Sequence, residues 1–256
     1  MDTRVQAYMR VGASHGRATE RIGPFLATFT AHTDNPYLNY ALPDDGATPS
    51  DEDVAALIVA FAARSRRPRL EYVSRLAPAV EPRLLAAGFM VEDQLPLMIC
   101  ERGEERAVAS PAGIDIGLPT TDADLFGMIA AQNEAFGGAP PAADDVERLR
   151  ASIEAGQIAV LARVVATGEV VGGGVCIAPA DGISEIAGIG VRGSFRRRGI
   201  AGALTARLVD EAFAVGVQTV FLTPGNEAAG RVYLRAGFAT AGEILHISKP
   251  PCALER

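Results

Sequence analysis

One segment of the sequence joins a strand pattern to a helix pattern through a turn rich in arginine and glycine. Residues 184–191 are apolar and glycine-rich, as in a buried strand, and residues 200–215 carry apolar side chains at helical spacing. The first N–H groups of a helix have no intrahelical partner and carry the positive end of its dipole. Because Gly199 lets an anion approach the backbone, the turn predicts a phosphate site, with a solvated arginine face as the alternative.

The turn differs from two common phosphate-binding motifs. It lacks the Gly-Lys-Ser/Thr of a P-loop, and it has one glycine where a dinucleotide motif needs three. The formal net charge of the chain is −7, which disfavours general binding to nucleic acid. Arginines that are a local exception in an acidic chain favour a small anionic ligand.

The next segment has a second recognisable pattern. Residues 217–223 are β-branched and aromatic, as in a strand, and Pro-Gly-Asn then forms a turn. Asn226 can cap the helix that follows, and Gly237 ends it. The Arg-x-x-Gly-x-Ala of residues 196–201, followed by Asn226, Tyr233 and Gly237-Phe238, resembles the GNAT superfamily of N-acetyltransferases over roughly residues 112–250.

The resemblance implies a fold and a reaction. The fold is α/β, with a mixed, twisted sheet flanked by helices, in which the strand of residues 185–191 parts from the next one. Acetyl-CoA is the implied cosubstrate, and the acetyl group passes to a primary amine by direct attack in a ternary complex. A backbone N–H of residue 189, 190 or 191 is the implied oxyanion donor, and the Asn226 amide binds the cofactor backbone or a structural water. The implied cofactor-binding residues are Ile189, Gly190, Val191, Arg196, Arg197, Arg198, Gly199, Ile200, Ala201 and Asn226.

Two side chains are the candidate catalytic residues. Tyr233, seven positions after Asn226 as in the family, is placed to protonate the departing thiolate. An amphipathic tyrosine at a boundary between helix and sheet is the alternative. Glu185 is the candidate general base, and an exposed carboxylate at a strand end is its alternative. Glu134 and Asp181 are second choices, and an amine that arrives neutral needs no base.

The sequence leaves the acceptor open. The family resemblance places it against residues 136–145 and 239–247, where Asp144 and Asp145, together with Glu134, either attract a cationic amine or are helix charges. A small amine, an aminoglycoside, an amino acid and a protein N-terminus are all compatible. Glycines within residues 187–191 indicate a bulge or a close approach, or else relieve crowding in a buried strand.

The chain is expected to form two units joined by an exposed linker at residues 101–111. Residues 84–89 resemble residues 233–238 at an offset of 149 positions, with Leu84 at the place of Tyr233 and Ala77 at that of Asn226. Nothing in residues 1–105 repeats the glycine-arginine turn. We therefore interpret 1–105 as a degenerate, catalytically silent copy and 112–250 as the catalytic domain, with a coincidental helix cap as the alternative.

Other features narrow the class of protein. The three cysteines and three histidines are scattered, so neither a disulfide framework nor a metal site is expected. No apolar run reaches the roughly 18 residues of a membrane span, and the first residues lack the apolar core of a secretion signal, so a cytoplasmic location is expected. A homodimer is compatible with the sequence. The competing hypotheses are a catalytically silent CoA-binding regulatory module and a nucleic-acid-binding protein.

Overall fold

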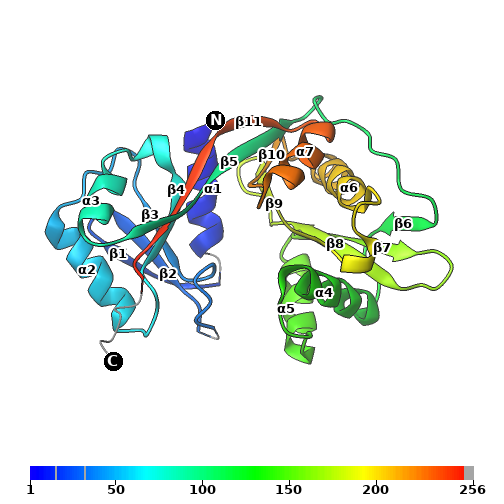
Figure 1. The fold of residues 1–256 in the computed structure, drawn as a ribbon, viewed down its shortest axis with the longest axis horizontal. Coiled ribbons are helices and arrows are strands. Elements are labelled where there is room, and N and C mark those ends of the chain that lie inside the picture. The colour runs from blue at the N-terminus through cyan, green and yellow to red at the C-terminus, as the bar shows by residue number, and fades with distance from the viewer. Residues whose placement is uncertain (15, 32, 251–256) are drawn as a thin grey trace. The chain divides into compact units, whose positions relative to one another are not determined.

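The computed structural model describes residues 1–14, 16–31 and 33–250 and divides into two compact units. Among these residues, the first unit comprises those up to residue 97 and residues 241–250, and the second comprises residues 98–240. The chain within each unit is easily followed by its colour in Figure 1. Residues 241–250, expected in the second domain, therefore lie in the first unit, because the last strand of the chain pairs there.

In the first unit a three-stranded antiparallel meander leads through a helix into a parallel strand. Strands β1 to β3 pair in order, β3 and β4 are parallel, and β4 pairs antiparallel with β11. Helices α2 and α3 pack on one face of this sheet and α1 on the other (Figure 1). The elements are α1 (Asp2–Ser14), β1 (Ala18–Ile22), β2 (Phe25–Phe29), β3 (Tyr40–Pro43), α2 (Asp51–Ala62), β4 (Arg69–Val73), a 3₁₀ turn (Ser74–Leu76), α3 (Val80–Ala86) and β11 (Ala239–Ser248).

The second unit repeats this order and adds a strand and two helices before it. Strands β6 to β9 are antiparallel in sequence order, β9 and β10 are parallel, and β10 pairs antiparallel with the end of β5. The elements are the end of β5 (Met90–Glu101), β6 (Ile114–Gly117), α4 (Asp122–Phe136), α5 (Ala143–Glu154), β7 (Ile158–Val164), β8 (Val170–Cys176), β9 (Ile183–Val191), a 3₁₀ turn (Gly193–Phe195), α6 (Ile200–Ala214), β10 (Thr219–Leu222) and α7 (Glu227–Arg235).

The shared order extends to individual positions. Helix α2 begins at Asp51 and α6 at Ile200, which is the offset of 149 positions seen in the sequence. Gly88 after α3 and Gly237 after α7 both have left-handed backbones, with φ of 82° and 103°. Strand β5, which follows α3, pairs with β10 and completes the sheet of the second unit. Strand β11, which follows α7, pairs with β4 and completes the sheet of the first unit. The structure therefore supports a repeat, with its closing strands exchanged.

Helix α6 supplies the centre of the second unit's core. Ten of its residues are buried, including Leu204, Leu208 and Val209, and they pack on the apolar faces of β7 to β9. Its apolar stripe is thus core packing, as its spacing indicates. Among the described residues, no helix combines the length and apolar character that a membrane span requires.

The expected α/β class with a mixed, twisted sheet is confirmed, and several elements differ in detail. The strand expected over residues 217–223 is limited to Thr219–Leu222. Helix α2 begins at Asp51, because Ser50 caps it and accepts the N–H of Asp53 at 3.1 Å. Helix α1 and strands β1 to β3 were not predicted.

Candidate active site

Strands β9 and β10 part in the middle of the second unit's sheet. Their parallel pairing joins Ile183, Ser184 and Glu185 to residues 219–221, and β10 ends at Leu222, whereas β9 continues to Val191. The expected split after Glu185 is therefore present. Backbone groups of β9 beyond this point face a gap in the sheet.

A bulge interrupts β9 beside this gap. The register with β8 shifts so that Gly188 and Ile189 together oppose Gly174. Gly188 has a φ of 63°, and its carbonyl accepts a hydrogen bond from Gln132 Nε2 at 2.7 Å. A Cβ on Gly190 would lie 3.0 Å from Gln132 Cα, so this glycine also permits a close approach of α4. The strand glycines thus serve both the bulge and the close approach.

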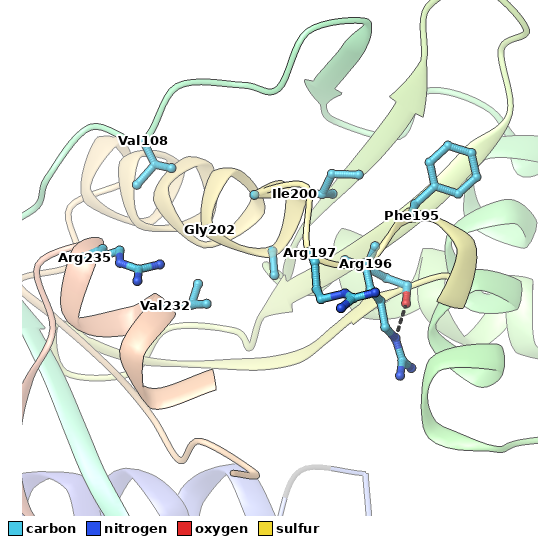
Figure 2. A pocket seen from close by; sticks show the side chains of 11 residues that line it. Val108, Phe195, Arg196, Arg197, Ile200, Gly202, Val232 and Arg235 are labelled. Atoms are coloured by element: carbon cyan, nitrogen blue, oxygen red, sulfur yellow. Dashed lines mark hydrogen bonds between the residues drawn. The ribbon is translucent and has the colours of Figure 1, made fainter. Parts of the chain in front are cut away.

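A cavity of about 200 Å³, here called the cradle cavity, lies at the start of α6 (Figure 2). Six of the expected cofactor-binding residues line it: Val191, Arg196, Arg197, Gly199, Ile200 and Ala201. Five further residues line it that sequence reasoning missed: Val108, Phe195, Gly202, Val232 and Arg235. Their positions depend on how α6, α7 and the preceding loop pack, which no local pattern indicates.

The start of α6 is open to a ligand. Gly199 is its N-cap, has a φ of 85°, and has no side chain to cap the first turn. The first N–H groups of α6 therefore lack the side-chain acceptor that Ser50 supplies to α2. Helix α2 also begins with three carboxylates, whereas α6 has none in its first turn. An anion is favoured at α6 and disfavoured at α2.

The three consecutive arginines have different roles. Arg196 donates from Nε to the Val191 carbonyl at 3.2 Å (Figure 2). It also donates from Nη2 to the Ala135 carbonyl at 2.9 Å, so it holds the loop. Arg198 bonds to the Ser194 carbonyl at 3.0 Å and stacks on Phe195, and it does not line the cradle cavity. Arg197, with a φ of 61°, lines the cavity.

Glu134 fastens this loop to α4. Its carboxylate accepts the Gly193 N–H at 3.0 Å and a bond from Arg192 Nη1 at 2.6 Å. The backbone hydrogen bond from Gly193, followed by that from Arg192, lowers the pKa of Glu134. A carboxylate held ionised by two donors is a weak base, so the structure favours a positioning role for Glu134 over its role as a second-choice base.

A second cavity, of about 320 Å³ and here called the β9–α7 cavity, lies beside the split in the sheet. Glu185, Asn226 and Tyr233 line it together with the bulge residues Gly188 and Ile189. Residues far apart in the sequence, and chosen from it separately, therefore meet at one place. Gly190 lies between the two cavities on β9.

Tyr233 and Asn226 come from the same helix. The Tyr233 ring packs against Phe238 with a centroid separation of 6.1 Å, and burial raises the pKa of its hydroxyl. The phenol therefore stays protonated at neutral pH and can donate a proton. Asn226 Oδ1 accepts the Ala229 N–H at 2.9 Å and caps α7, so its Nδ2 group is the donor that the amide offers to a ligand.

Among the other acidic candidates, Asp145 is held by neighbouring groups at the start of α5. Asp145 accepts the Ala142 N–H at 2.7 Å and pairs with Arg148, and the first of these bonds does most to lower its pKa. Asp144 lies beside it in the first turn of α5. Asp181 has a φ of 50° in the turn before β9 and is absent from the residues that line either cavity.

The described residues hold no cluster of three or more histidine, cysteine or acidic side chains suited to a metal ion. Burial raises the pKa of the Cys100 and Cys176 thiols to about 12, so both remain protonated at neutral pH. His15, His32 and Cys252 lie outside the described residues.

Comparison with known proteins bears on both units. The model of the acetyltransferase (GNAT) family matches residues 127–238. A GCN5-related N-acetyltransferase from Kribbella flavida is 26% identical, with a TM-score of 0.83 over 99% of this chain and 97% of that one. One from Sphaerobacter thermophilus is 19% identical, with a TM-score of 0.67 over 89% of this chain and 78% of that one. A tandem GNAT protein from the clavulanic acid biosynthesis pathway is 15% identical, with a TM-score of 0.62 over 94% of this chain and 87% of that one. No protein with a curated description matches the sequence.

Strands β9 and β10 part beside the start of α6, which has no side-chain cap. Together with the similarity to these solved structures, this arrangement defines the fold of an acyl-CoA-dependent acetyltransferase. The chain carries an acetyltransferase domain of the GNAT family over residues 127–238. Members of this family take an acetyl group from acetyl-CoA and act on amine acceptors. The expected family and enzyme class are thereby confirmed.

Proposed function

We propose that the protein transfers an acetyl group from acetyl-CoA to a primary amine by direct attack in a ternary complex. The observation that carries this proposal is that β9 and α7 each line both cavities. Val191 and Val232 face the cradle cavity, whereas Ile189 and Tyr233 face the β9–α7 cavity. One elongated ligand can therefore run from the start of α6 to the split in the sheet.

The cradle cavity holds the diphosphate in this proposal. The open N–H groups after Gly199 and the Arg197 guanidinium bind its charge. Arg196 contributes by holding the loop, and Arg198 by its stacking on Phe195, rather than through direct contact. Asn226 offers its Nδ2 group to the pantetheine arm in the β9–α7 cavity.

The residues of the β9–α7 cavity supply the chemistry. As the nitrogen–carbon bond forms, Glu185 takes a proton from the amine, directly or through water. The backbone N–H of Ile189, displaced from regular pairing by the bulge, donates to the developing oxyanion. As the carbon–sulfur bond breaks, Tyr233 gives its proton to the thiolate, and its raised pKa keeps that proton available.

The first unit is catalytically silent in this proposal, and each chain binds one acetyl-CoA. The start of α2 is closed by Ser50 and by the carboxylate of Asp53, which accepts the Ser50 N–H at 2.9 Å. Ala77 stands at the place of Asn226 and Leu84 at that of Tyr233, and both are fully buried apolar side chains. The corresponding positions therefore offer neither an anion site nor a proton donor.

Thiol release from acetyl-CoA in the presence of a panel of amines tests the proposal. We expect Tyr233→Phe to lower the rate with the best amine by about 10²-fold, which is the lower end of general acid catalysis. Affinity for acetyl-CoA, measured by calorimetry, should remain within about twofold because the ring packing is retained. Tyr37→Phe, at an exposed tyrosine of the first unit, is the matched control.

Two results would contradict the proposal. An unchanged rate in Tyr233→Phe removes this hydroxyl from the mechanism. Tight binding of acetyl-CoA without thiol release for any amine favours a regulatory module that has lost its chemistry.

A further inference from the structure

An apolar strip divides the cradle cavity between two positively charged ends. Its walls are Val108, from the loop before β6, and Val232, from α7, and its floor is Gly202 of α6 (Figure 2). A Cβ on Gly202 would meet Val108 at 3.4 Å and Val232 at 3.5 Å, so the missing side chain keeps the strip open. A flat apolar group fits between such walls better than a charged one does.

Two guanidinium groups with no partner among the described residues face this cavity. Arg197 enters from the turn before α6, and Arg235 enters from the last turn of α7, with Val232 and Gly202 between them (Figure 2). Within residues 1–14, 16–31 and 33–250, neither guanidinium has a hydrogen bond or an ion pair to another residue. One turn earlier on α7, by contrast, Arg231 pairs with Glu227 at 3.2 Å. Two cations left unpaired around one cavity favour a ligand with two separated anionic groups.

We propose that Arg235 binds the 3′-phosphate of acetyl-CoA and makes the protein selective for the 3′-phosphorylated nucleotide. This inference rests on the proposed function, which places the diphosphate at Arg197 and the start of α6. The adenosine then lies along the strip formed by Val108, Gly202 and Val232, and the 3′-phosphate reaches the cation at the far end. The guanidinium fork matches a phosphate geometrically, so the contact carries specificity as well as attraction.

Calorimetric titration of acetyl-CoA and of acetyl-3′-dephospho-CoA tests the assignment. We expect the wild type to bind acetyl-CoA about tenfold more tightly than the dephospho compound at low ionic strength, since hydrogen bonds between two charged groups are of this order. Arg235→Gln keeps the length of the side chain but removes the charge. It should weaken acetyl-CoA binding by about tenfold and leave the dephospho compound within about twofold.

Arg231→Gln is the matched control on the same helix. Its cation is paired and lies outside the cavity, so both affinities and their ratio should stay as in the wild type. Raising the salt concentration should shrink the preference of the wild type but not that of Arg235→Gln, which should already have none.

The outcomes separate this inference from the function on which it rests. Equal binding of both compounds by the wild type, or an equal loss of both in Arg235→Gln, overturns the assignment of Arg235 alone. Absence of binding of either compound to the wild type and to Arg231→Gln refutes the proposed function and this assignment together.

Discussion

Replacing Gly190 by alanine tests how tightly α4 packs on the bulged strand. The new Cβ would lie 3.0 Å from Gln132 Cα and 3.1 Å from Ala135 Cβ, closer than nine in ten natural contacts of Cβ atoms. The backbone at Gly190 is not left-handed, so the cost comes from packing rather than from strain in φ. Overpacking of this kind costs about 1–3 kcal/mol, because a helix backbone has to move by a few tenths of an ångström.

This movement of α4 should also disturb the candidate active site. Helix α4 carries Gln132, which bonds to the bulge at Gly188, and Glu134, which holds the loop at Gly193. We therefore expect Gly190→Ala to lower the free energy of unfolding in urea by about 1–3 kcal/mol and to weaken acetyl-CoA binding by about tenfold. Calorimetry under native conditions separates the second effect from the first.

Gly230→Ala is the matched control for this substitution. Its Cβ would meet Pro224 at an ordinary 3.8 Å, and it lies inside α7, where alanine stabilises a helix by about 1 kcal/mol relative to glycine. The two variants should therefore change stability in opposite directions. Unchanged stability and unchanged affinity in Gly190→Ala would refute the close approach of α4 to β9.

Two further predictions concern carboxylates that hold α4 in place. Burial raises the pKa of Asp124, but hydrogen bonds from Arg163 and Thr120 outweigh it and lower the pKa from 3.8 to about 2. Asp124→Asn should therefore lower the free energy of unfolding in urea by about 2 kcal/mol at neutral pH. The difference from the wild type should close as the pH falls from about 4 toward 2, because the native carboxylate gains its proton in that range. A difference that does not depend on pH would contradict this. Glu134→Gln removes the charge opposite Arg192 and should weaken acetyl-CoA binding about threefold in calorimetry without changing the rate at saturation, whereas a large loss of rate would indicate catalysis by Glu134.

The parts of the fold that the sequence predicted are those with a strong local signal. Helix α6 follows from its apolar stripe, and α7 begins after Asn226, which caps it as the sequence indicates. Helix α1 was missed although its buried residues Val5, Tyr8 and Met9 have helical spacing, and β1 was missed because its polar side chains hide its strand character. The exchange of closing strands was not predictable, since β5 and β11 pair with strands remote in the sequence.

The residues of the candidate site also divide into those that a local sequence motif predicted and those that depend on packing. Gly199 and Tyr233 stand in motifs, so they were found, and the structure places each at a cavity. The sequence did not distinguish Arg197 from Arg196 and Arg198, because all three side chains carry the same positive charge. They differ only in the carbonyl acceptors that the folded loop places near Arg196 and Arg198. Arg235 was missed because its role depends on the distance between α6 and α7, which packing alone sets.

Calorimetric titration with acetyl-CoA tests the central claim most directly, with the wild type, Gly199→Glu and Gly168→Glu compared. Both glycines have left-handed backbones, with φ of 85° and 73°, so the strain is matched. A Cβ on Gly199 would meet Pro111 at an ordinary 3.8 Å, and one on Gly168, in the turn between β7 and β8, would meet no atom within 4 Å. We predict micromolar binding to the wild type and to Gly168→Glu, and none to Gly199→Glu, where a carboxylate occupies the anion site. Equal binding by all three proteins would contradict the placement of the diphosphate at the start of α6, and absence of binding to the wild type would contradict the enzyme itself.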